Sequence, residues 1–398
     1  MSESRQPRRR LRTIRDLDLF EKRVLLRADF NVPFDGDRIL DDSRIRAAVP
    51  TIRALLSLGT EIRLVTHRGR PGGKVVPELS VAPLAARLQE IVGIPVRVAP
   101  GAAGPPVELF LSELTPGDLA MLENVRFEPG EEANDPGFCR LLADLADAYV
   151  NDAFGAAHRA HASTEGVAHL LPSAAGLLME KEVTILSQVL HNPREPLVAI
   201  VGGAKISTKI GVMENPLPRV SAMLVGGAMA CTLLKADGAE VGDSKVEDDQ
   251  LDTARRLLEK GGDKLALPVD AVVADAFSAD ANIKVVDARA VPAGWMMLDI
   301  GPRTRAAFTA RVEEAGTVVW NGPLGVYEMA PFRAGTEAVA RAVAKSPAIS
   351  IVGGGDLAAA IAQLGLEDSI THVSTGGGAT LEFLEGKDLP GIRVLEED

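Results

Sequence analysis

Residues 197–205 read Leu-Val-Ala-Ile-Val-Gly-Gly-Ala-Lys, a short and continuous apolar run that ends in two glycines. Such a run, bounded by glycine, is typical of a strand buried on both faces of a parallel sheet. Similar Val/Ile/Leu-rich runs alternate with amphipathic stretches along the chain, which is the pattern of strands joined by crossover helices. We therefore predict an α/β fold with mainly parallel, doubly wound sheets.

The expected strands fall into two groups. Those of the first half are residues 24–27, 62–66, 96–98, 119–122 and 148–151, and those of the second half are residues 197–201, 222–225, 271–274, 317–320, 350–352 and 372–374. Between the groups, Val183, Leu186 and Val189 follow helical spacing, and Pro193 ends the segment. We predict a first domain over residues 1–171, a helical connector over 172–192 and a second domain over 193–385.

Composition narrows the possible partners. At 398 residues the chain is too long for one compact core, and its net charge of −12 disfavours nucleic acids and membrane surfaces, which require a broad basic face. Its apolar runs are far shorter than the ~20 residues of a membrane span. With only two cysteines, Cys139 and Cys231, a disulfide framework is excluded, and we expect a cytoplasmic protein. We interpret the arginine-rich start as a solvated terminus, with Arg5, Arg8, Arg9, Arg10 and Arg12.

Basic side chains, with one amide and one carboxylate, follow the expected strands of the first half. Ligands of open α/β sheets bind beyond the carboxyl ends of the strands, so these residues are candidates for a site. They are Asp29, Asn31, His67, Arg70, Arg126, His158 and Arg159, with Arg44 at the start of a helix. One such arginine is usually a surface salt bridge, but several at corresponding strand ends predict an anion pocket, because guanidinium forks match phosphate and carboxylate. The histidines lack the spacing of a zinc site.

The strands of the second half end in glycines instead. Glycine lets the backbone approach a ligand, and free N–H groups at a following helix bind phosphate. Lys205 and Lys209 stand four residues apart in the helix expected after Gly203, which would put both ammonium groups on one face. These features predict a polyphosphate site. Asp356 fits either a Mg²⁺ ligand or a helix N-cap. The glycine turns are at residues 202–203, 226–227, 322, 353–355 and 376–378.

Two familiar nucleotide-binding motifs do not fit. No Gly-x-x-x-x-Gly-Lys-Ser/Thr run occurs in the sequence. Residues 353–358, Gly-Gly-Gly-Asp-Leu-Ala, match the glycine pattern of a dinucleotide-binding turn, but the next expected strand ends in Ser-Thr-Gly (374–376) rather than in an acidic residue. A dehydrogenase is therefore disfavoured.

A set of motifs, taken in chain order from about residue 13 to the end, closely resembles the phosphoglycerate kinase family. One motif alone would be modest support, but the ordered set is specific. The motifs are Arg-Ala-Asp-Phe-Asn-Val-Pro (27–33), His-Arg-Gly-Arg-Pro (67–71), Glu-Asn-Val-Arg-Phe (123–127), Asn-Asp-Ala-Phe-Gly with His-Arg-Ala-His (151–161), Gly-Gly-Ala-Lys with a second Lys (202–209), Trp-Asn-Gly-Pro with a Glu (320–328), Gly-Gly-Gly-Asp (353–356) and Ser-Thr-Gly-Gly-Gly-Ala (374–379).

The resemblance implies two Rossmann-like three-layer domains and a reversible, Mg²⁺-dependent transfer between ATP and 3-phosphoglycerate, giving ADP and 1,3-bisphosphoglycerate, in glycolysis or carbon fixation. It also implies a monomer, with residues 386–398 packed on the first domain. The phosphoglycerate would bind Asp29, Asn31, Arg44, His67, Arg70, Arg126, His158 and Arg159. The nucleotide would bind Gly203, Lys205, Lys209, Gly227, Asn321, Pro323, Glu328 at the ribose, Gly353, Gly354, Gly355, and Asp356 beside Mg²⁺.

The expected mechanism needs no protein nucleophile, because the substrate carboxylate attacks. Catalysis would come from positioning and charge neutralisation, by Arg44 on one side and by Lys205, Mg²⁺ and the amides of Gly376, Gly377 and Gly378 on the other. Substrates held by separate domains would meet by closure around residues 172–192 and near the last strand. Leu357, Ala228 and Arg68 depart from the family pattern, and their effect on the affinity for nucleotide or substrate is left open. The alternative is a non-catalytic nucleotide sensor that kept both clefts.

Overall fold

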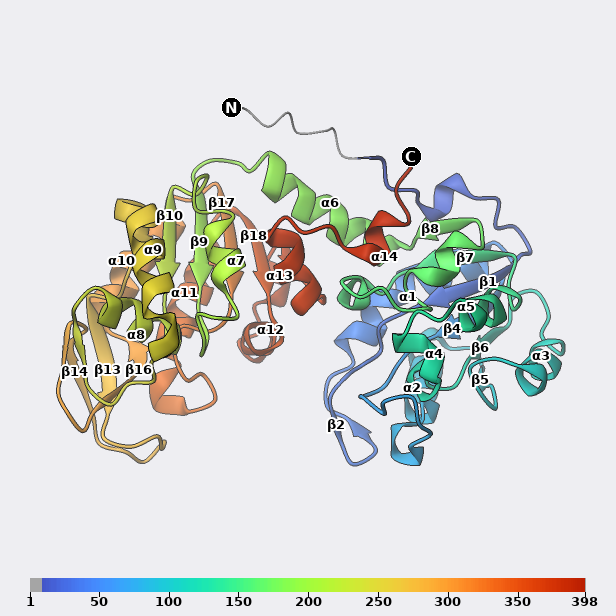
Figure 1. Cartoon of the computed structure of the whole chain (residues 1–398), viewed down its shortest axis with the longest axis horizontal. Helices are drawn as coiled ribbons and strands as arrows, with labels where there is room; N and C mark the ends of the chain where they lie inside the picture. The colour runs from blue at the N-terminus through green and yellow to red at the C-terminus, as the bar shows by residue number, and fades with distance from the viewer. Residues whose placement is uncertain (1–8, 398) are drawn as a thin grey trace. The chain divides into compact units, whose positions relative to one another are not determined.

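The computed structural model describes residues 9–397, so Arg5 and Arg8 lie outside the described residues. The chain divides into two compact units. One contains the described residues up to Thr184 together with those from Asp388 onward, and the other is Ile185–Lys387. The boundary falls inside helix α6 (Leu177–His191). Each unit has a main sheet with helices packed around it (Figure 1).

The elements follow one another in a largely alternating order. The first unit contains β1 (Arg23–Arg27), β2 (Phe34–Asp35), β3 (Arg38–Ile39), α1 (Ser43–Ser57), β4 (Glu61–Val65), α2 (Ala82–Val92), β5 (Val96–Val98), α3 (Pro105–Leu111), β6 (Leu119–Met121), α4 (Pro129–Glu132), α5 (Pro136–Ala143), β7 (Ala148–Asn151), β8 (Ser173–Ala175) and α14 (Pro390–Arg393). The second contains β9 (Leu197–Val201), α7 (Ile210–Glu214), β10 (Ala222–Val225), α8 (Gly227–Ala236), β11 (Glu240–Val241), α9 (Leu251–Gly261), β12 (Leu265–Ala266), β13 (Asp270–Ala274), β14 (Ile283–Asp287), β15 (Ala290–Val291), β16 (Met296–Ile300), α10 (Pro302–Glu313), β17 (Thr317–Asn321), α11 (Ala334–Lys345), β18 (Ile349–Gly353), α12 (Gly355–Gln363), β19 (His372–Val373) and α13 (Gly378–Leu384).

The first unit is built on a parallel sheet. Among the described residues its strands lie in the order β5-β6-β4-β1-β7-β8. Helix α1 packs Ile45 and Ile52 into the core of this unit, and β1 is buried over Val24–Arg27. Arg27, the last residue of β1, pairs in register with Val65 and Asn151, the last residues of β4 and β7. The loops after these three strands therefore start side by side.

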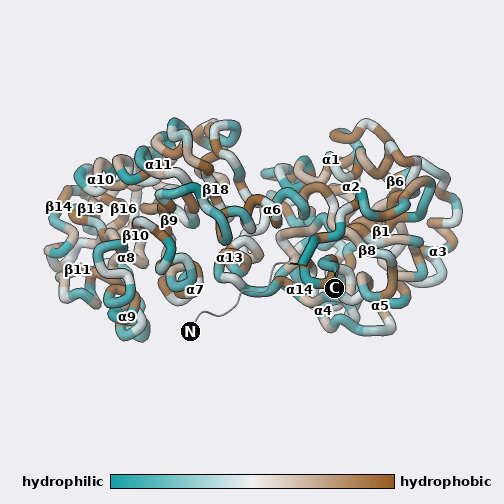
Figure 2. Tube along the Cα trace, turned by 90° about the horizontal axis from the view of Figure 1, so that it is seen from above, coloured by the Kyte–Doolittle hydropathy of each residue, from teal (hydrophilic) through white to brown (hydrophobic). Residues whose placement is uncertain are grey.

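The second unit repeats this arrangement with a sheet in the order β12-β10-β9-β17-β18-β19, counted over residues 9–397. Strand β9 is buried along its whole length, and Trp320 on β17 has no exposed surface. Figure 2 shows the hydrophobic strands of each sheet enclosed by more hydrophilic helical turns. Val201, Val225 and Asn321 stand in register at the ends of their strands, so the glycine turns after them converge. The predicted α/β class and the two mainly parallel sheets are confirmed.

One predicted strand belongs to a different sheet. Residues 271–274 were expected in the parallel sheet, but β13 is the central strand of an antiparallel sheet, ordered β14-β13-β16. The prediction was wrong because β13 is buried throughout and reads like a parallel strand, whereas its partner β14 is mostly exposed and less apolar. Instead of β13, the short edge strand β12 pairs with β10 in the parallel sheet.

The segment 172–192 is not helical throughout, since β8 precedes α6. The buried carboxylate of Asp152 accepts the Leu178 and Met179 N–H groups at 2.9 and 3.1 Å and so caps the start of α6. The end of the chain contacts the first unit through Asn151, whose Nδ2 donates to the Gly391 carbonyl over 3.3 Å. None of the helices within residues 9–397 is both long and apolar enough to cross a membrane.

Candidate functional site

The loop after β1 carries a connected set of polar side chains. Arg44, at the start of α1, donates from Nη1 to Asp29 Oδ2 over 2.9 Å and to the Asn31 carbonyl over 3.2 Å. Asn31 Oδ1 accepts the Gly69 N–H at 2.9 Å, which ties this loop to the one after β4. The Arg44 side chain is 30% exposed, so its remaining donors are open to an anion.

His67 follows β4 and is buried. Its Nδ1 lies 3.0 Å from Nη2 of Arg27 and 3.9 Å from Oδ1 of Asp29. Burial, reinforced by the charges of nearby arginines, holds the pKa of His67 well below its usual range, so the ring is neutral. The arginines that act on it are Arg27, Arg126, Arg44 and Arg159, which shows that their fields add at this position.

Arg126 belongs to a 3₁₀ turn, Val125–Phe127, after β6. Its Nη1 donates to the Gly69 carbonyl over 2.9 Å. Asn124 Oδ1 accepts the N–H groups of Arg68 and Arg126, and its Nδ2 donates to the Arg68 carbonyl over 2.7 Å. The loops after β4 and β6 are therefore held as one piece.

The remaining predicted residues lie in the loops after β7 and β4. Arg159 Nε donates to His158 Nε2 over 3.1 Å, and Arg70 is exposed. Burial lowers the pKa of His161 to about 4. The carboxyl edge of the first sheet thus gathers arginines around two neutral histidines, His67 and His161. This arrangement is suited to a small anion with more than one charged group.

The fully buried Arg27 was not among the residues predicted to contact a ligand. Its guanidinium touches His67, and Nε donates to Ser163 Oγ over 2.8 Å. An arginine that ends an otherwise apolar strand was the available signal. Arg68, a departure from the family pattern, is also buried, and its guanidinium carbon lies 3.6 Å from the centroid of the Phe34 ring.

In the second unit, a cavity of about 290 Å³ lies where the glycine turns meet. A Cβ on Gly202 would come within 2.1 Å of the Pro323 carbonyl oxygen, so the loops after β9 and β17 pack backbone against backbone. Gly354 has a φ of +99°, which favours glycine. The polar groups of the lining include Lys205, Lys209, Asn321 and Asp356.

The prediction that one helix carries both Lys205 and Lys209 is wrong. Residues 206–209 form a bend and a turn, and α7 starts at Ile210 with Lys209 at its N-cap position. Ser207 instead donates its N–H and its hydroxyl to the Glu247 carboxylate, at 3.1 and 2.5 Å. Hydroxyl side chains and such non-helical contacts compete with helix formation. Both lysines line the cavity all the same.

Asn321 connects the walls of this cavity. Its Oδ1 accepts a hydrogen bond from Lys209 Nζ, and its Nδ2 donates to the Gly353 carbonyl over 2.9 Å. Burial lowers the pKa of Lys209, and the charge of Asp356 opposes the shift. A phosphate in the cavity would act in the same direction as Asp356 and raise the pKa of Lys209.

A second cavity of about 360 Å³ shares Gly203, Pro323 and Asp356 with the first. Its walls are more apolar and include Gly227, Ala228, Met296 and Leu298, with the exposed Glu328 at its edge. Leu357, which departs from the family pattern, is buried in the core at the start of α12. The two cavities together suit an elongated ligand with an apolar end and an anionic end.

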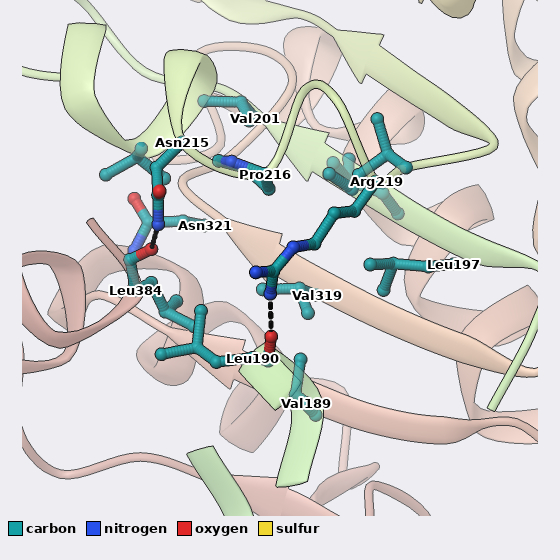
Figure 3. A pocket seen from close by; sticks show the side chains of 14 residues that line it. Val189, Leu190, Leu197, Val201, Asn215, Pro216, Arg219, Val319, Asn321 and Leu384 are labelled. Atoms are coloured by element: carbon teal, nitrogen blue, oxygen red, sulfur yellow. Dashed lines mark hydrogen bonds between the residues drawn. The ribbon is translucent and has the colours of Figure 1, made fainter. Parts of the chain in front are cut away.

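Asn321 also lines an apolar cavity of about 40 Å³ (Figure 3). Its two polar neighbours are engaged, since Arg219 donates to the Leu190 carbonyl and Asn215 Nδ2 donates to the Leu384 carbonyl over 2.7 Å. The space offers nothing to hold an anion. Asn321 therefore borders both a polar, ligand-sized cavity and a small apolar one.

The turn before α13 contains the glycines predicted to act in catalysis. Gly377 has a φ of +52° and precedes the helix, and the Gly376 N–H donates to Ser374 Oγ over 3.2 Å. The N–H of Gly378 belongs to the first turn of α13, where amides lack a partner within the helix.

Asp299 follows Leu298 on β16, and its carboxylate lies against Gly325, which also lines the second cavity. Its Oδ1 accepts the Ile300 N–H at 2.9 Å and its Oδ2 the Gly335 N–H at 2.8 Å, and burial raises its pKa to about 7. Because the folded-state pKa lies above the ordinary value of 3.8, this residue favours the folded state most at low pH, and the benefit is lost as the pH rises towards 7.

We therefore expect the free energy of unfolding of the parent to fall relative to that of Asp299→Asn by up to about 1.4 kcal/mol per pH unit between pH 5 and 7. Above pH 7 the difference should become constant. Denaturant unfolding of both proteins at a series of pH values measures this. A difference that does not vary with pH would contradict the assignment.

Asp356 is the residue predicted to hold a metal ion. Residues 9–397 contain no group of three or more His, Cys, Asp or Glu side chains arranged to hold a metal ion. Asp356 is exposed and lines both cavities, and its carboxylate is the kind of hard oxygen ligand that Mg²⁺ prefers.

Known proteins match the chain over nearly its full length. The phosphoglycerate kinase family model matches residues 14–387. Phosphoglycerate kinase of Roseiflexus sp. (strain RS-1) is 54% identical over 391 residues, covering 97% of this chain and 99% of the relative, and that of Moorella thermoacetica is 55% identical over 388 residues, covering 97% and 99%. The solved structure of phosphoglycerate kinase from Coxiella burnetii has a TM-score of 0.87 and 44% identity over 97% of this chain and 99% of that one. On these matches, the chain belongs to the phosphoglycerate kinase family.

Proposed function

We propose that this chain catalyses the reaction of its family, the reversible transfer of a phosphoryl group between ATP and 3-phosphoglycerate, giving ADP and 1,3-bisphosphoglycerate. The observation that carries the proposal is a division of chemistry within one chain. The first unit gathers arginine and histidine side chains at one sheet edge, and the second gathers glycine turns and two lysines around a cavity. Each suits one of the two substrates.

In this proposal 3-phosphoglycerate binds the first unit. Its phosphate and carboxylate are held by the arginines Arg44, Arg70, Arg126 and Arg159 with His67 and His158, and Asp29 and Asn31 accept hydrogen bonds from its hydroxyl or orient Arg44. The contact between Asp29 and Arg44, 2.9 Å long, supports the second role. No protein nucleophile is required, because the substrate carboxylate attacks the terminal phosphate of ATP.

The nucleotide would bind across the two cavities of the second unit. Its base would face the apolar wall that contains Gly227, and its ribose would face Glu328. Its phosphates would bind the two lysines and the glycine turns, namely Lys205, Lys209, Gly203, Asn321–Pro323 and Gly353–Gly355. Asp356 would hold Mg²⁺, which neutralises phosphate charge when bound. The transferring group would be stabilised from both sides. Arg44 would act from the side of 3-phosphoglycerate, and Lys205 would act from the side of the nucleotide together with the amides of Gly376, Gly377 and Gly378.

Transfer requires the two bound substrates to meet, and we propose that closure of the units about residues 172–192 achieves this. We further propose that the protein acts as a monomer in the cytoplasm. Its two cysteines support a reducing compartment, since both are buried and free.

An assay with ATP, Mg²⁺ and 3-phosphoglycerate, coupled to reduction of 1,3-bisphosphoglycerate, tests the function. Turnover dependent on both substrates is expected. Tight nucleotide binding without turnover would support the rival idea of a nucleotide sensor and would overturn the enzymatic proposal.

Asp356→Asn tests the metal assignment. Because the amide keeps the shape but loses the charge, we expect the Mg²⁺ concentration for half-maximal activity to rise about tenfold or more. The exposed Asp356 carries no buried contact, so stability should change little. Activity is titrated with Mg²⁺ at fixed ATP. An unchanged Mg²⁺ dependence would show that another group holds the ion.

A further inference from the structure

Arg27 is less exposed than any of the proposed substrate ligands. It ends β1, is 1% exposed, and is therefore shielded from any ligand in the site. Its Nε donates to Ser163 Oγ over 2.8 Å, and its Nη1 donates to the Ala28 carbonyl. Nη2 remains, and it points to His67 Nδ1 over 3.0 Å.

The other partners of this network fix the direction of each hydrogen bond. Ser163 Oγ donates its one proton to Glu131 Oε1 over 2.6 Å, so it can only accept from Arg27. The Ser163 N–H donates to Glu131 Oε2 over 2.9 Å, and Tyr149 donates to the Ser163 carbonyl over 2.7 Å. Arg27, Glu131, Ser163 and Tyr149 are all buried, so none of these partners is easily replaced by water.

A guanidinium has only donors, so His67 Nδ1 must accept from Arg27 and carry a lone pair. The competing arrangement places a proton on Nδ1 that would point to Asp29, but that carboxylate is 3.9 Å away, beyond hydrogen-bond distance. Asp29 is instead bound by Arg44 at 2.9 Å and by the Asn31 N–H at 3.2 Å. The geometry thus favours one tautomer, with the proton on Nε2.

We propose that Arg27 is a positioning residue, which does not touch the substrate but holds His67 as the neutral tautomer whose Nε2 donates to an anionic oxygen of the substrate. This inference rests on the proposed function for the identity of that anion. The opposite tautomer would present a lone pair at Nε2 and repel phosphate or carboxylate. A neutral donor also lets His67 bind the anion without adding a further charge beside four arginines.

Charges face His67 from every side of its surroundings. Arg27 comes from β1, Arg44 from α1, Arg126 from the turn after β6 and Arg159 from the loop after β7, and each of these cations lowers the pKa of His67. Asp29 on the loop after β1 is the carboxylate that opposes them. Loss of Arg27 should therefore allow both tautomers of His67 to form and move the pKa of His67 back towards its ordinary range.

The direct test is ¹⁵N NMR of the imidazole nitrogens in the full-length protein labelled at histidine, without substrate. The chain has six histidines, and His67→Gln identifies the His67 signals by their absence. We expect the neutral Nε2–H form at pH 6.5, the ordinary pKa of histidine, and above. An Nδ1–H form, or an imidazolium at pH 6.5, would overturn the inference.

Arg27→Met removes the donor and the charge but keeps the apolar stem. We expect His67 to populate both tautomers, and the KM for 3-phosphoglycerate to rise about tenfold or more while the KM for ATP stays unchanged. The increase in KM should shrink below pH 6, because the imidazolium again donates from Nε2. An unchanged tautomer, or a KM ratio to the parent that is independent of pH, would contradict the role.

Two further variants guard against a purely structural effect. Arg63→Met is the matched control, since Arg63 is also a buried arginine of this sheet but is bonded to Glu61 over 3.1 Å and to the Leu145 carbonyl. It should cost stability without changing the His67 signals. Ser163→Ala keeps Arg27 but removes the acceptor of its Nε, so some of the opposite His67 tautomer should appear in its spectrum. This variant keeps the inference testable if Arg27→Met does not fold.

Failure of the proposed function would appear differently. It would be seen as absence of turnover in the parent, whereas the tautomer measurement needs no substrate.

Discussion

Arg44→Ala is expected to lower kcat by about a thousandfold or more, comparable to the loss of one preorganised donor from an oxyanion site. The side chain is held by Asp29 and by the Asn31 carbonyl, with donors left over for the transferring group. Alanine would also leave the Asp29 carboxylate without its partner beside an anionic substrate, so the KM for 3-phosphoglycerate should rise as well.

The same substitution should cost little stability. Arg44 is 30% exposed, and ion pairs near the surface contribute about 0–1 kcal/mol. Steady-state kinetics at saturating substrates and denaturant unfolding separate the two effects. Arg46→Ala is the matched control, because Arg46 lies on the same helix, is 55% exposed and bonds Asp42 over 2.8 Å. Near-normal turnover of Arg44→Ala, or an equal loss in the control, would refute the role.

The sequence was most informative about strands and about the residues that come directly after them. Buried strands such as Leu197–Val201 are continuous apolar runs, and the residues after each run are read directly from the chain. Since parallel strands end at one edge, the arginines of the first unit and the glycines of the second could be assigned to common edges from the sequence alone.

The failures have identifiable physical causes. Lys205 and Lys209 lie in turns rather than a helix, because Glu247, far along the chain, binds the Ser207 backbone. The partner of β13 depends on a mostly exposed strand, β14, that carries little apolar signal. The buried role of Arg27 was missed, because it depends on contacts with Ser163 and Glu131, which are distant in the sequence. In each case a distant contact decides what a local pattern leaves open.

Gly202→Ala should abolish most nucleotide binding by forcing two loops apart. The new Cβ would lie 2.1 Å from the Pro323 oxygen and 2.8 Å from the Gly322 oxygen, and neither backbone atom can rotate away as a side chain would. The fit is mutual, because a Cβ on Gly322 would meet the Gly202 oxygen at 2.4 Å. We expect a loss of about 3 kcal/mol in stability and at least about 100-fold in ATP affinity.

Gly355→Ala separates loop packing from contact with the nucleotide. Gly355 is the first residue of α12, and a Cβ there meets nothing within 4 Å, so stability should stay within about 0.5 kcal/mol of the parent. If phosphates occupy that space, the methyl group must displace them, and ATP affinity should fall about tenfold. Calorimetric titration with ATP and thermal unfolding of both variants measure the two quantities. Parental ATP affinity in Gly355→Ala would move the phosphates away from α12, whereas parental stability in Gly202→Ala would show that the loops after β9 and β17 can separate without cost.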